Sequence, residues 1–429
     1  MPDTDAAHVN IFIVSNDLPA VTFMPDDCEL IRDINKNGGI TASEFKKIDL
    51  GLGYDAMLDI YNEDHRVYIR THLVNEGNEQ KESVIIDKDG NIDPSTYLLL
   101  DYEKVTKIVA RPIDEEPIVI EGGLFITRVP QLAEHYQQYV QRGIVIARSG
   151  TTVKNITHEV WDEGEFGCPY SGFINVQRSA NIKVENCSFM SHKTYNVINK
   201  DGVRTNMGTY DISLQGSCNI AFVGCTQSNF FEDEGARLPY FAPERWGIMG
   251  SNYCKDISYE NCRLSRLDAH CGVYNVSLKN CEVVYISVVG GGTLTVEDTI
   301  IYNDNVIQLR GDYGSTWKGD IIVKNVTLVN INEPVFFNAG WTNHDYGYKT
   351  YLPTTLTIDG LQIYRGNRIT FFSDSFINKG DIGSDTHDGA VNENPMEPLG
   401  TIVVKNNSQN IEYVLLRNKF FADTELIFE

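Results

Sequence analysis

Histidines and carboxylates recur five to eight residues after a cysteine that itself recurs along the chain. The sets are His192 with Lys193 after Cys187, Glu232 with Asp233 after Cys225, and Asp268 with His270 after Cys262. Two carboxylates about 5 to 10 Å apart can act as the acid and the base of glycoside hydrolysis. Clustered carboxylates also raise one another's pKa, which a general acid needs at neutral pH. These residue types predict a glycan-cleaving site, provided that the fold brings them together.

We assign the chemistry to four of these side chains. Asp268 and one of Glu232 and Asp233 would act as acid and base, and His270 would orient a group or relay a proton. The predicted substrate-binding residues are the other charged and aromatic side chains nearby: His192, Lys193, Tyr195, Trp246, Arg266, Arg310 and Asp312. An aromatic ring beside carboxylates suits a sugar, because the ring face packs against C–H groups. The alternative is that all of these are polar loop residues that only face solvent.

A nine-residue sequence repeat, which we call the phrase, occurs seven times and must position these groups. It occupies residues 181–189, 219–227, 256–264, 275–283, 293–301, 320–328 and 355–363. In each copy two apolar residues stand two apart, then Asn, Gly or Asp follows, and a short apolar stretch ends the phrase. Alternating apolar residues predict a strand with one buried face. Asn, Gly or Asp tolerates a sharp backbone bend between two strands.

A strand–bend–strand unit too small to bury its own face must stack on its neighbours. The sequence therefore predicts an all-β chain, a single-stranded right-handed parallel β-helix with loop excursions that form a cleft on one side. One predicted stack is Ile182, Ile220, Ile257, Val276, Leu294, Ile321 and Leu356; a second is Val184, Phe222, Tyr259, Leu278, Val296, Val323 and Ile358; the bends are Asn186, Gly224, Asn261, Asn280, Asp298, Asn325 and Gly360. Seven matches to one template make an antiparallel sandwich the weaker alternative.

Unequal spacing between the copies indicates where loops leave the stack. Long insertions fall at residues 190–215 and 228–248, and residues 338–353 form a further excursion rich in aromatic side chains. Loops that emerge on one face of a solenoid commonly build its binding surface. Turns about 4.8 Å apart would also bring the three chemical sets within the distances that carboxylate pairs use.

A lyase is the competing chemistry. It needs a base to remove a proton and a cation to neutralise the carboxylate of a uronate. His192, Lys193 and Arg266 could supply both. No Asp-x-x-x-Asp pair stands on adjacent copies of the phrase to mark a calcium-rich acidic edge. Hydrolysis is therefore favoured over elimination, and both alternatives stay open.

Four of the nine cysteines share one position of the phrase: Cys187, Cys225, Cys262 and Cys281. An inward strand position suits a cysteine as a small buried hydrophobe. No Cys-x-x-Cys motif and no Cys/His pair with zinc spacing occurs in the chain. We therefore predict packing rather than a disulfide or metal role for this set.

The domain prediction divides the chain at residue 50. Residues 1–50 read as an irregular N-terminal segment or cap, and residues 51–429 as the β-helix with a C-terminal cap from about residue 365. Alternating stretches between residues 51 and 125 are interpreted as early turns or a cap of the same solenoid.

One weak metal site is predicted near the N-terminus. Asp33, Asn35, Asn37 and Glu44 match ligand positions of an EF-hand calcium loop. No partner loop follows, and the favoured alternative is a Gly/Asn turn before a short helix at residues 43–48. No cofactor is expected to be required, and Ca²⁺ is a weak possibility only.

Composition limits the partners. The chain holds 36 basic and 59 acidic residues, a net charge of −23, which argues against nucleic acid or an anionic membrane as the main partner. The sequence contains no run of 18 apolar residues, so it predicts no membrane span. The first residues lack the pattern of a signal peptide. We expect an extracellular or virion-associated protein.

Several phrases carry a more specific resemblance. They are Tyr170-Ser-Gly-Phe-Ile, His192-Lys-Thr-Tyr, Met207-Gly-Thr-Tyr-Asp211, Trp246-Gly-Ile-Met-Gly-Ser-Asn-Tyr-Cys-Lys255, Asp268-Ala-His270 and Leu309-Arg-Gly-Asp-Tyr-Gly-Ser-Thr-Trp317. The repeat resembles the pectin-lyase-like β-helix superfamily. Over residues 50 to 365 the chain looks like tail-spike or appendage proteins of phages and prophages of Gram-positive bacteria. The resemblance implies a glycan-facing virion role and a possible homotrimer, and it assigns no catalytic residue.

The resulting functional prediction is a carbohydrate-active β-helix protein. It would bind and cleave a cell-surface or capsular polysaccharide as a tail-spike-like depolymerase of the glycoside hydrolase type. The first alternative is a secreted bacterial polysaccharide lyase. The second is a non-catalytic receptor-binding or structural module of a virion.

Overall fold

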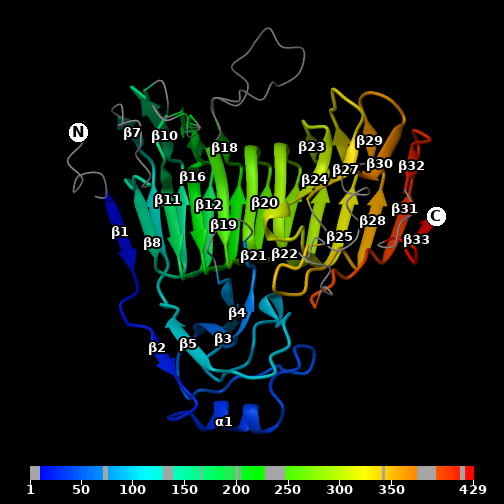
Figure 1. Ribbon diagram of the computed structural model, residues 1–429. Helices are drawn as coiled ribbons and strands as arrows, with labels where there is room; N and C mark the ends of the chain where they lie inside the picture. The colour runs from blue at the N-terminus through cyan, green and yellow to red at the C-terminus, as the bar shows by residue number, and fades with distance from the viewer. Residues whose placement is uncertain are drawn as a thin grey trace.

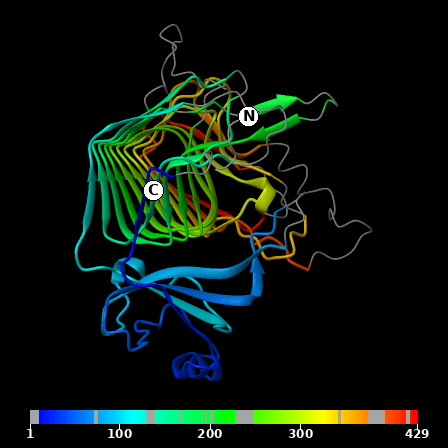
Figure 2. The ribbon, with the colours of Figure 1, turned by 90° about the vertical axis from the view of Figure 1, so that its left-hand side faces the viewer.

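The structure is a computed structural model that describes residues 10–70, 76–128, 139–164, 167–190, 192–193, 195–198, 202, 204–227, 247–340, 344–373, 393–415 and 421–429. Its main element is a 27-stranded sheet coiled into a solenoid, in which all strand pairings are parallel (Figure 1). Viewed along the stack, successive turns lie over one another (Figure 2). The predicted parallel β-helix is confirmed.

Each turn of the solenoid contributes to three faces, which we call the first, second and third sheets. The first sheet contains β1 (Phe12–Ser15), β8 (Ile144–Ala147), β11 (Ser171–Gln177), β16 (Thr209–Gln215), β19 (Gly247–Asn252), the middle of β21 (Arg263–Lys279) and of β22 (Glu282–Glu297), β24 (Asn305–Leu309), β27 (Val335–Ala339), β30 (Arg368–Phe372) and β32 (Glu412–Val414). β21 and β22 are long because they run through all three faces without a break.

The second sheet contains β6 (Ile118–Glu121), β9 (Thr151–Lys154), β12 (Ala180–Glu185), β17 (Cys218–Val223), β20 (Lys255–Glu260), the ends of β21 and β22, β25 (Trp317–Lys324), β28 (Thr355–Asp359), β31 (Thr401–Lys405) and β33 (Glu425–Phe428). The third sheet contains β7 (Leu124–Arg128), β10 (Thr157–Trp161), β13 (Ser188–Phe189), β18 (Thr226–Gln227), the starts of β21 and β22, β23 (Ile300–Ile301), β26 (Thr327–Leu328) and β29 (Gln362–Ile363).

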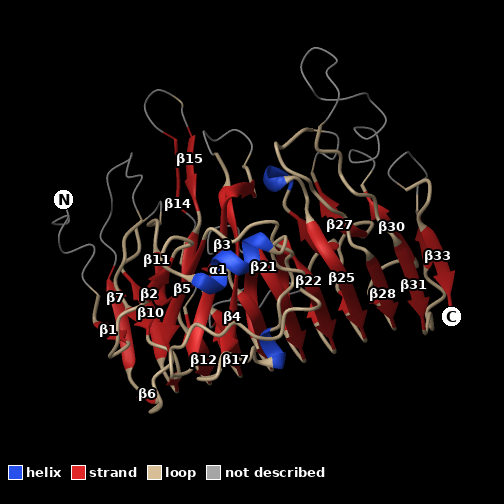
Figure 3. Cartoon of the chain, turned by 90° about the horizontal axis from the view of Figure 1, so that it is seen from below, coloured by secondary structure: helices blue, strands red, loops and turns tan. Residues whose placement is uncertain are grey.

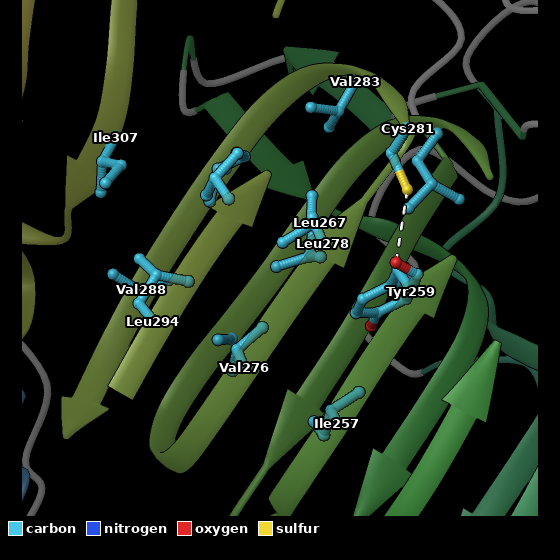
Figure 4. Packing of buried hydrophobic residues seen from close by; sticks show 14 of the residues in the cluster. Ile257, Tyr259, Leu267, Val276, Leu278, Cys281, Val283, Val288, Leu294 and Ile307 are labelled. Carbon is cyan, nitrogen blue, oxygen red and sulfur yellow. Dashed lines mark hydrogen bonds between the residues drawn. The ribbon is translucent and has the colours of Figure 1, made fainter. Parts of the chain in front are cut away.

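The strand register confirms the predicted stacks. Ile182 pairs with Ile220, Ile220 with Ile257, and the column continues turn by turn to Leu356. The second column runs in the same way from Val184 to Ile358. Both columns point into one continuous core, part of which Figure 4 shows around Ile257, Val276 and Leu294. A turn therefore buries its apolar face against the turn above and the turn below.

The bends have the predicted backbone conformation. Asn186, Asn261 and Asn280 have φ values of 51°, 54° and 51°, in the left-handed region that Asn and Gly tolerate best. The side chains form a ladder, since Asn280 Nδ2 donates to Asn261 Oδ1 at 2.6 Å. A second bend, not predicted, lies near the start of several second-sheet segments; Asn219 there has φ 55° and donates to Asn181 Oδ1 at 2.7 Å. These neighbouring turns thus satisfy their bend amides with one another.

The stacked cysteines pack as predicted. Cys187, Cys225, Cys262 and Cys281 are buried, and every cysteine of the described chain is a free thiol. Cys281 Sγ donates to the carbonyl oxygen of Tyr259, one turn away, at 3.4 Å (Figure 4). These side chains therefore fill the core beside the bend.

The structure differs from the predicted domain boundary. Residues 56–112 do not form early turns. Together with β2 (Val21–Phe23) they build a four-stranded antiparallel sheet that also contains β5 (Lys107–Pro112), β3 (Ala56–Val67) and β4 (Asn78–Ile86). This sheet, α1 (Glu29–Lys36) and the 3₁₀ turn Pro94–Thr96 have their own core. We call residues 21–112 the flank subdomain. It lies beneath the middle turns of the solenoid, not over an end (Figures 1 and 3). Conversely, β1 from the expected cap joins the first sheet.

The C-terminal region also departs from the prediction of a cap from about residue 365. β30, β31, β32 and β33 continue the parallel pairing of the first and second sheets up to Phe428. The hairpin of β14 (Tyr195–Ile198) and β15 (Arg204–Met207) is antiparallel and projects from the stack (Figure 3). No helix among the described residues is long and apolar enough to cross a membrane.

A buried ion pair fixes the flank subdomain to the solenoid. Lys255 Nζ lies 2.9 Å from Glu82 Oε2, and both side chains are almost fully buried. The ammonium also donates to the carbonyl oxygens of Thr96 and Tyr97, while the carboxylate accepts the amides of Leu99 and Leu100. Because each charge has hydrogen-bonding partners, this pair can be buried without an uncompensated charge.

One residue of the predicted calcium loop, Asn35, binds the backbone of another segment. Asp33 and Asn35 lie on α1, which continues to Lys36, whereas a ligand loop would already have left its helix. The side-chain amide of Asn35 binds the backbone of Val105, with distances of 2.9 and 2.7 Å. The expected turn exists at Gly38 and Gly39, with φ values of 91° and 97°. The helix expected at residues 43–48 is absent; a turn stands there instead.

Candidate functional site

Asp268 lies on the outward side of the first sheet. Its neighbours in β21, Leu267 and Ala269, point into the core, so the alternation of a strand turns Arg266, Asp268 and His270 outward. The Asp268 side chain is nevertheless only 2% exposed. The charged groups that surround it therefore decide its chemistry.

Two arginines share one oxygen of Asp268. Arg266 Nη2 donates to Oδ2 at 3.2 Å and Arg310 Nη1 at 3.4 Å, and His270 Nδ1 lies 3.7 Å from the same atom. The other oxygen, Oδ1, is buried and has no hydrogen-bond partner among the described residues. One lone-pair face of the carboxylate is thus uncommitted.

The surroundings hold Asp268 in its ionised form. Burial alone would raise the pKa of its carboxyl group, but the charges of Arg266 and Arg310 outweigh burial and lower it well below the usual value. An acid with so low a pKa does not donate a proton near neutral pH. Asp268 is therefore suited to be a base or a nucleophile, and not the general acid.

The His270 ring is contacted at both of its nitrogens. Arg310 Nη1 lies 2.7 Å from its Nδ1, and a guanidinium can only donate, so Nδ1 accepts and the ring proton is on Nε2. Nε2 lies 3.2 Å from the hydroxyl of Tyr313, whose ring packs edge-on against the imidazole. The ring is therefore oriented from both sides, which fits the predicted positioning role.

Arg310 links this group to the flank subdomain. It binds Asp312 through two nitrogens, at 3.1 and 2.7 Å, and Arg70 Nε donates to Asp312 Oδ2 at 2.7 Å. Among the described residues, the guanidinium groups of Arg70, Arg266 and Arg310 thus stand around the carboxylates of Asp268 and Asp312.

Tyrosine rings border the charged group. The Arg266 guanidinium lies 5.1 Å from the ring centre of Tyr285, on the next turn. On the other side, the ring of Tyr210 occupies the space above Gly250, where an added Cβ would lie 2.4 Å from a ring carbon. Gly250 pairs with Asp268 in the sheet, so this ring approaches the carboxylate. Such rings suit sugar faces.

His192 and Lys193 belong to a second cluster in the solenoid wall. His192 Nδ1 lies 3.2 Å from Glu163 Oε1, and the backbone amide of Lys193 donates to Glu163 Oε2 at 2.9 Å. The imidazole stacks on Tyr170 with ring centres 4.4 Å apart, and it is fully buried. No hydrogen bond or ion pair between described residues joins this cluster to Asp268.

Asp211 adds a buried acid beside the second cluster. Gln227 Nε2 donates to its Oδ2, and its Oδ1 has no hydrogen-bond partner among the described residues. Burial raises the pKa of Asp211 to about 6, against the lowering effects of His192 and Gln227. This carboxyl group therefore holds its proton to a higher pH than an exposed aspartate.

The structure brings together Arg266, Asp268, His270, Arg310 and Asp312 as expected, and places Tyr195 in β14 with its side chain buried. Glu232, Asp233 and Trp246 lie outside the described residues. Among the described residues, no three His, Cys, Asp or Glu side chains gather as a metal site.

Sequence reasoning missed four residues of the two clusters: Arg70, Glu163, Asp211 and Tyr313. Asp211 and Tyr313 stand inside phrases that carried the resemblance, which was a usable signal. No sequence signal marked Arg70 or Glu163, because both contact their partners from another turn or from the flank subdomain.

No protein-family model matches this chain, and no curated protein matches it. Among solved structures it is similar to the tailspike protein gp49 from Pseudomonas phage LKA1, with a TM-score of 0.36 and 10% sequence identity. The similarity covers 76% of this chain and 60% of the tailspike, so the chain spans less than two thirds of that protein. Values this low describe a distant likeness between two structures.

Proposed function

We propose that this chain binds a cell-surface or capsular polysaccharide across the outward side of the first sheet and hydrolyses it. The observation that carries the proposal is the state of Asp268: an ionised, buried carboxylate with Oδ1 uncommitted among the described residues, bordered by tyrosine rings. Such a carboxylate accepts a proton or attacks an anomeric carbon once water or a sugar reaches Oδ1, which is buried in this structure.

The roles follow from the electrostatics. Asp268 takes the proton of the attacking water or attacks the sugar itself, since its pKa is too low for it to serve as the acid. Glu232 or Asp233 supplies the proton for the leaving oxygen; in the sequence they precede β19, the strand that pairs with Asp268. Arg266 and Arg310 keep Asp268 charged, and His270 fixes Arg310. The chemistry requires no cofactor.

The test is a screen of the purified chain against surface polysaccharides of Gram-positive bacteria, read by new reducing ends. Asp268→Asn should lower the cleavage rate by about 100-fold or more, the usual effect of removing a catalytic acid–base group. Asp423→Asn is the matched control, because Asp423 is exposed near the C-terminal end. Cleavage by Asp268→Asn at the rate of the unaltered chain would refute the assignment.

A lyase is the second candidate, and the three arginines around Asp268 and Asp312 favour it. Arg70, Arg266 and Arg310 could together neutralise the carboxylate of a uronate. Elimination leaves an unsaturated uronate, so products that absorb in the ultraviolet would select the lyase. Reducing ends without that absorbance would select hydrolysis.

The wider setting belongs to the same proposal. We place the chain outside the cell or on a virion, as a tail-spike-like homotrimer, on the basis of the sequence phrases and of its acidic charge. Binding of a surface polysaccharide without any cleavage would instead support the non-catalytic receptor-binding alternative. Mass measurement in solution tests the trimer.

A further inference from the structure

A cavity of about 790 Å³ lies between the flank subdomain and the solenoid. The flank side supplies the end of β3 and the segment after the 3₁₀ turn, including Tyr68 and Tyr97. The solenoid side supplies the starts of second-sheet strands and the excursion that ends at Tyr351. This volume is typical of a site for a small ligand or a few sugar units.

The cavity is separate from the Asp268 group. Neither Asp268 nor any of its direct partners lines it. Between the two lies a packed cluster of tyrosines, in which Tyr68, Tyr274 and Tyr348 face the cavity and Tyr313 contacts His270. The hydroxyls of Tyr68 and Tyr274 are 2.8 Å apart, which closes this wall. A ligand in the cavity would therefore occupy a second site.

Two tyrosines give the cavity aromatic surface. Tyr97 is 43% exposed, an unusual exposure for a ring set in a wall, and its backbone is held by Lys255. Across the cavity, the ammonium groups of Lys318 and Lys349 lie 5.2 and 5.7 Å from the ring centre of Tyr351. Tyr97 therefore presents a ring face for stacking, and the ammonium groups beside Tyr351 present hydrogen-bond donors.

Three glycines, Gly290, Gly292 and Gly319, line the cavity, so part of its floor is peptide backbone without side chains. A Cβ atom at Gly319 would lie 2.2 Å from the carbonyl oxygen of Gly292, and one at Gly292 would lie 2.3 Å from the Asn275 side chain. Close packing between neighbouring turns therefore requires glycine at these positions, and it leaves their peptide groups in the cavity wall. Peptide donors and acceptors then become available to hydroxyl groups.

Charges that line the cavity balance. Asp64 pairs with Lys104, and Lys349 pairs with Glu397. Lys318 and Asp320, two apart on β25, make no ion pair among the described residues. Arg66, which also lines the cavity, pairs with Glu79. One cation and one anion without an ion pair among the described residues favour a neutral ligand rich in hydroxyl groups over a strongly charged one.

We propose that this cavity binds a neutral oligosaccharide, as a carbohydrate site distinct from the Asp268 group. A pyranose ring stacks on Tyr97, its hydroxyls bind Lys318 and Asp320, and the glycine floor contacts its other edge. The proposal does not depend on hydrolysis at Asp268. It gives the protein a second binding site for a polysaccharide, on the side of the solenoid that carries the flank subdomain.

The test uses calorimetric titration of the full chain with three neutral hexasaccharides: cellohexaose, maltohexaose and chitohexaose. At least one should bind, and Tyr97→Ala and Lys318→Ala should each weaken its binding by about tenfold, the equivalent of 1.4 kcal/mol. Tyr364→Ala is the matched control, since Tyr364 is 62% exposed and does not line the cavity. Its affinity should stay within about twofold of the unaltered chain.

Either of two results would overturn the proposal: none of the three hexasaccharides binds, or Tyr97→Ala binds as tightly as the unaltered chain. Both altered side chains are exposed, so the variants should fold, and thermal unfolding by circular dichroism checks this. Tyr97→Phe gives an independent check, because it keeps the ring and should retain the affinity if stacking is the main contact.

Discussion

Removing Lys255 should loosen the flank subdomain and with it one wall of the carbohydrate cavity. Its ammonium is 1% exposed and lies 2.9 Å from Glu82 Oε2, whose side chain is fully buried. Lys255→Met keeps most of the unbranched side chain but leaves the Glu82 anion in the interior without its cation. Breaking a buried pair in this way costs about 3 to 5 kcal/mol.

The double variant separates the charge effect from the packing effect. In the double variant Lys255→Met with Glu82→Leu, neither charge remains in the interior. The loss of folding free energy then comes from the amides of Leu99 and Leu100, which no longer have their acceptor. An unpaired buried backbone group costs about 1 to 3 kcal/mol. The double variant should therefore lose less stability than the sum of the two single variants.

The assay is urea unfolding followed by circular dichroism, with amide exchange of Leu99 and Leu100 as a local readout. Exchange at both amides should accelerate in Glu82→Leu, and the carbohydrate affinity should fall in Lys255→Met because Tyr97 loses its backbone partner. A loss below about 1 kcal/mol for Lys255→Met, or strict additivity in the double variant, would refute the reasoning.

Two further predictions concern the solenoid itself. The pKa of Asp211 is raised from 3.8 to about 6, so the folded chain keeps a proton that the unfolded chain releases between those pH values. Stability should fall by up to about 3 kcal/mol as pH rises from 4 to 6, and Asp211→Asn should abolish this slope in unfolding titrations. Phe222→Ala should cost about 3 to 5 kcal/mol, because its buried ring stacks on Tyr259 at 4.9 Å. Phe428→Ala, at a ring 58% exposed, should change the free energy of unfolding little.

Much of the candidate site was predictable because it comes from only two segments: one strand, β21, and the loop directly after β24. Arg266, Asp268 and His270 alternate along β21, so their shared outward direction follows from strand geometry. The sequence alone did not exclude Asp268 as the general acid. The charges of Arg266 and Arg310 lower its pKa against burial; Arg266 is a near neighbour in the sequence, but Arg310 stands 42 residues away, and a charge at that separation leaves no local pattern.

The sequence by itself determined the solenoid. Each turn meets only its neighbours, so a local repeat fixes strand, bend and register together, and Ile182 falls on Ile220 as the pattern required. Only the tertiary structure decided the flank subdomain, because alternation in residues 56–86 suits antiparallel and parallel strands equally. The same holds for Lys255 with Glu82 and Arg70 with Asp312, 173 and 242 residues apart. Such pairs depend on where two separately built parts dock, which no short stretch of sequence records.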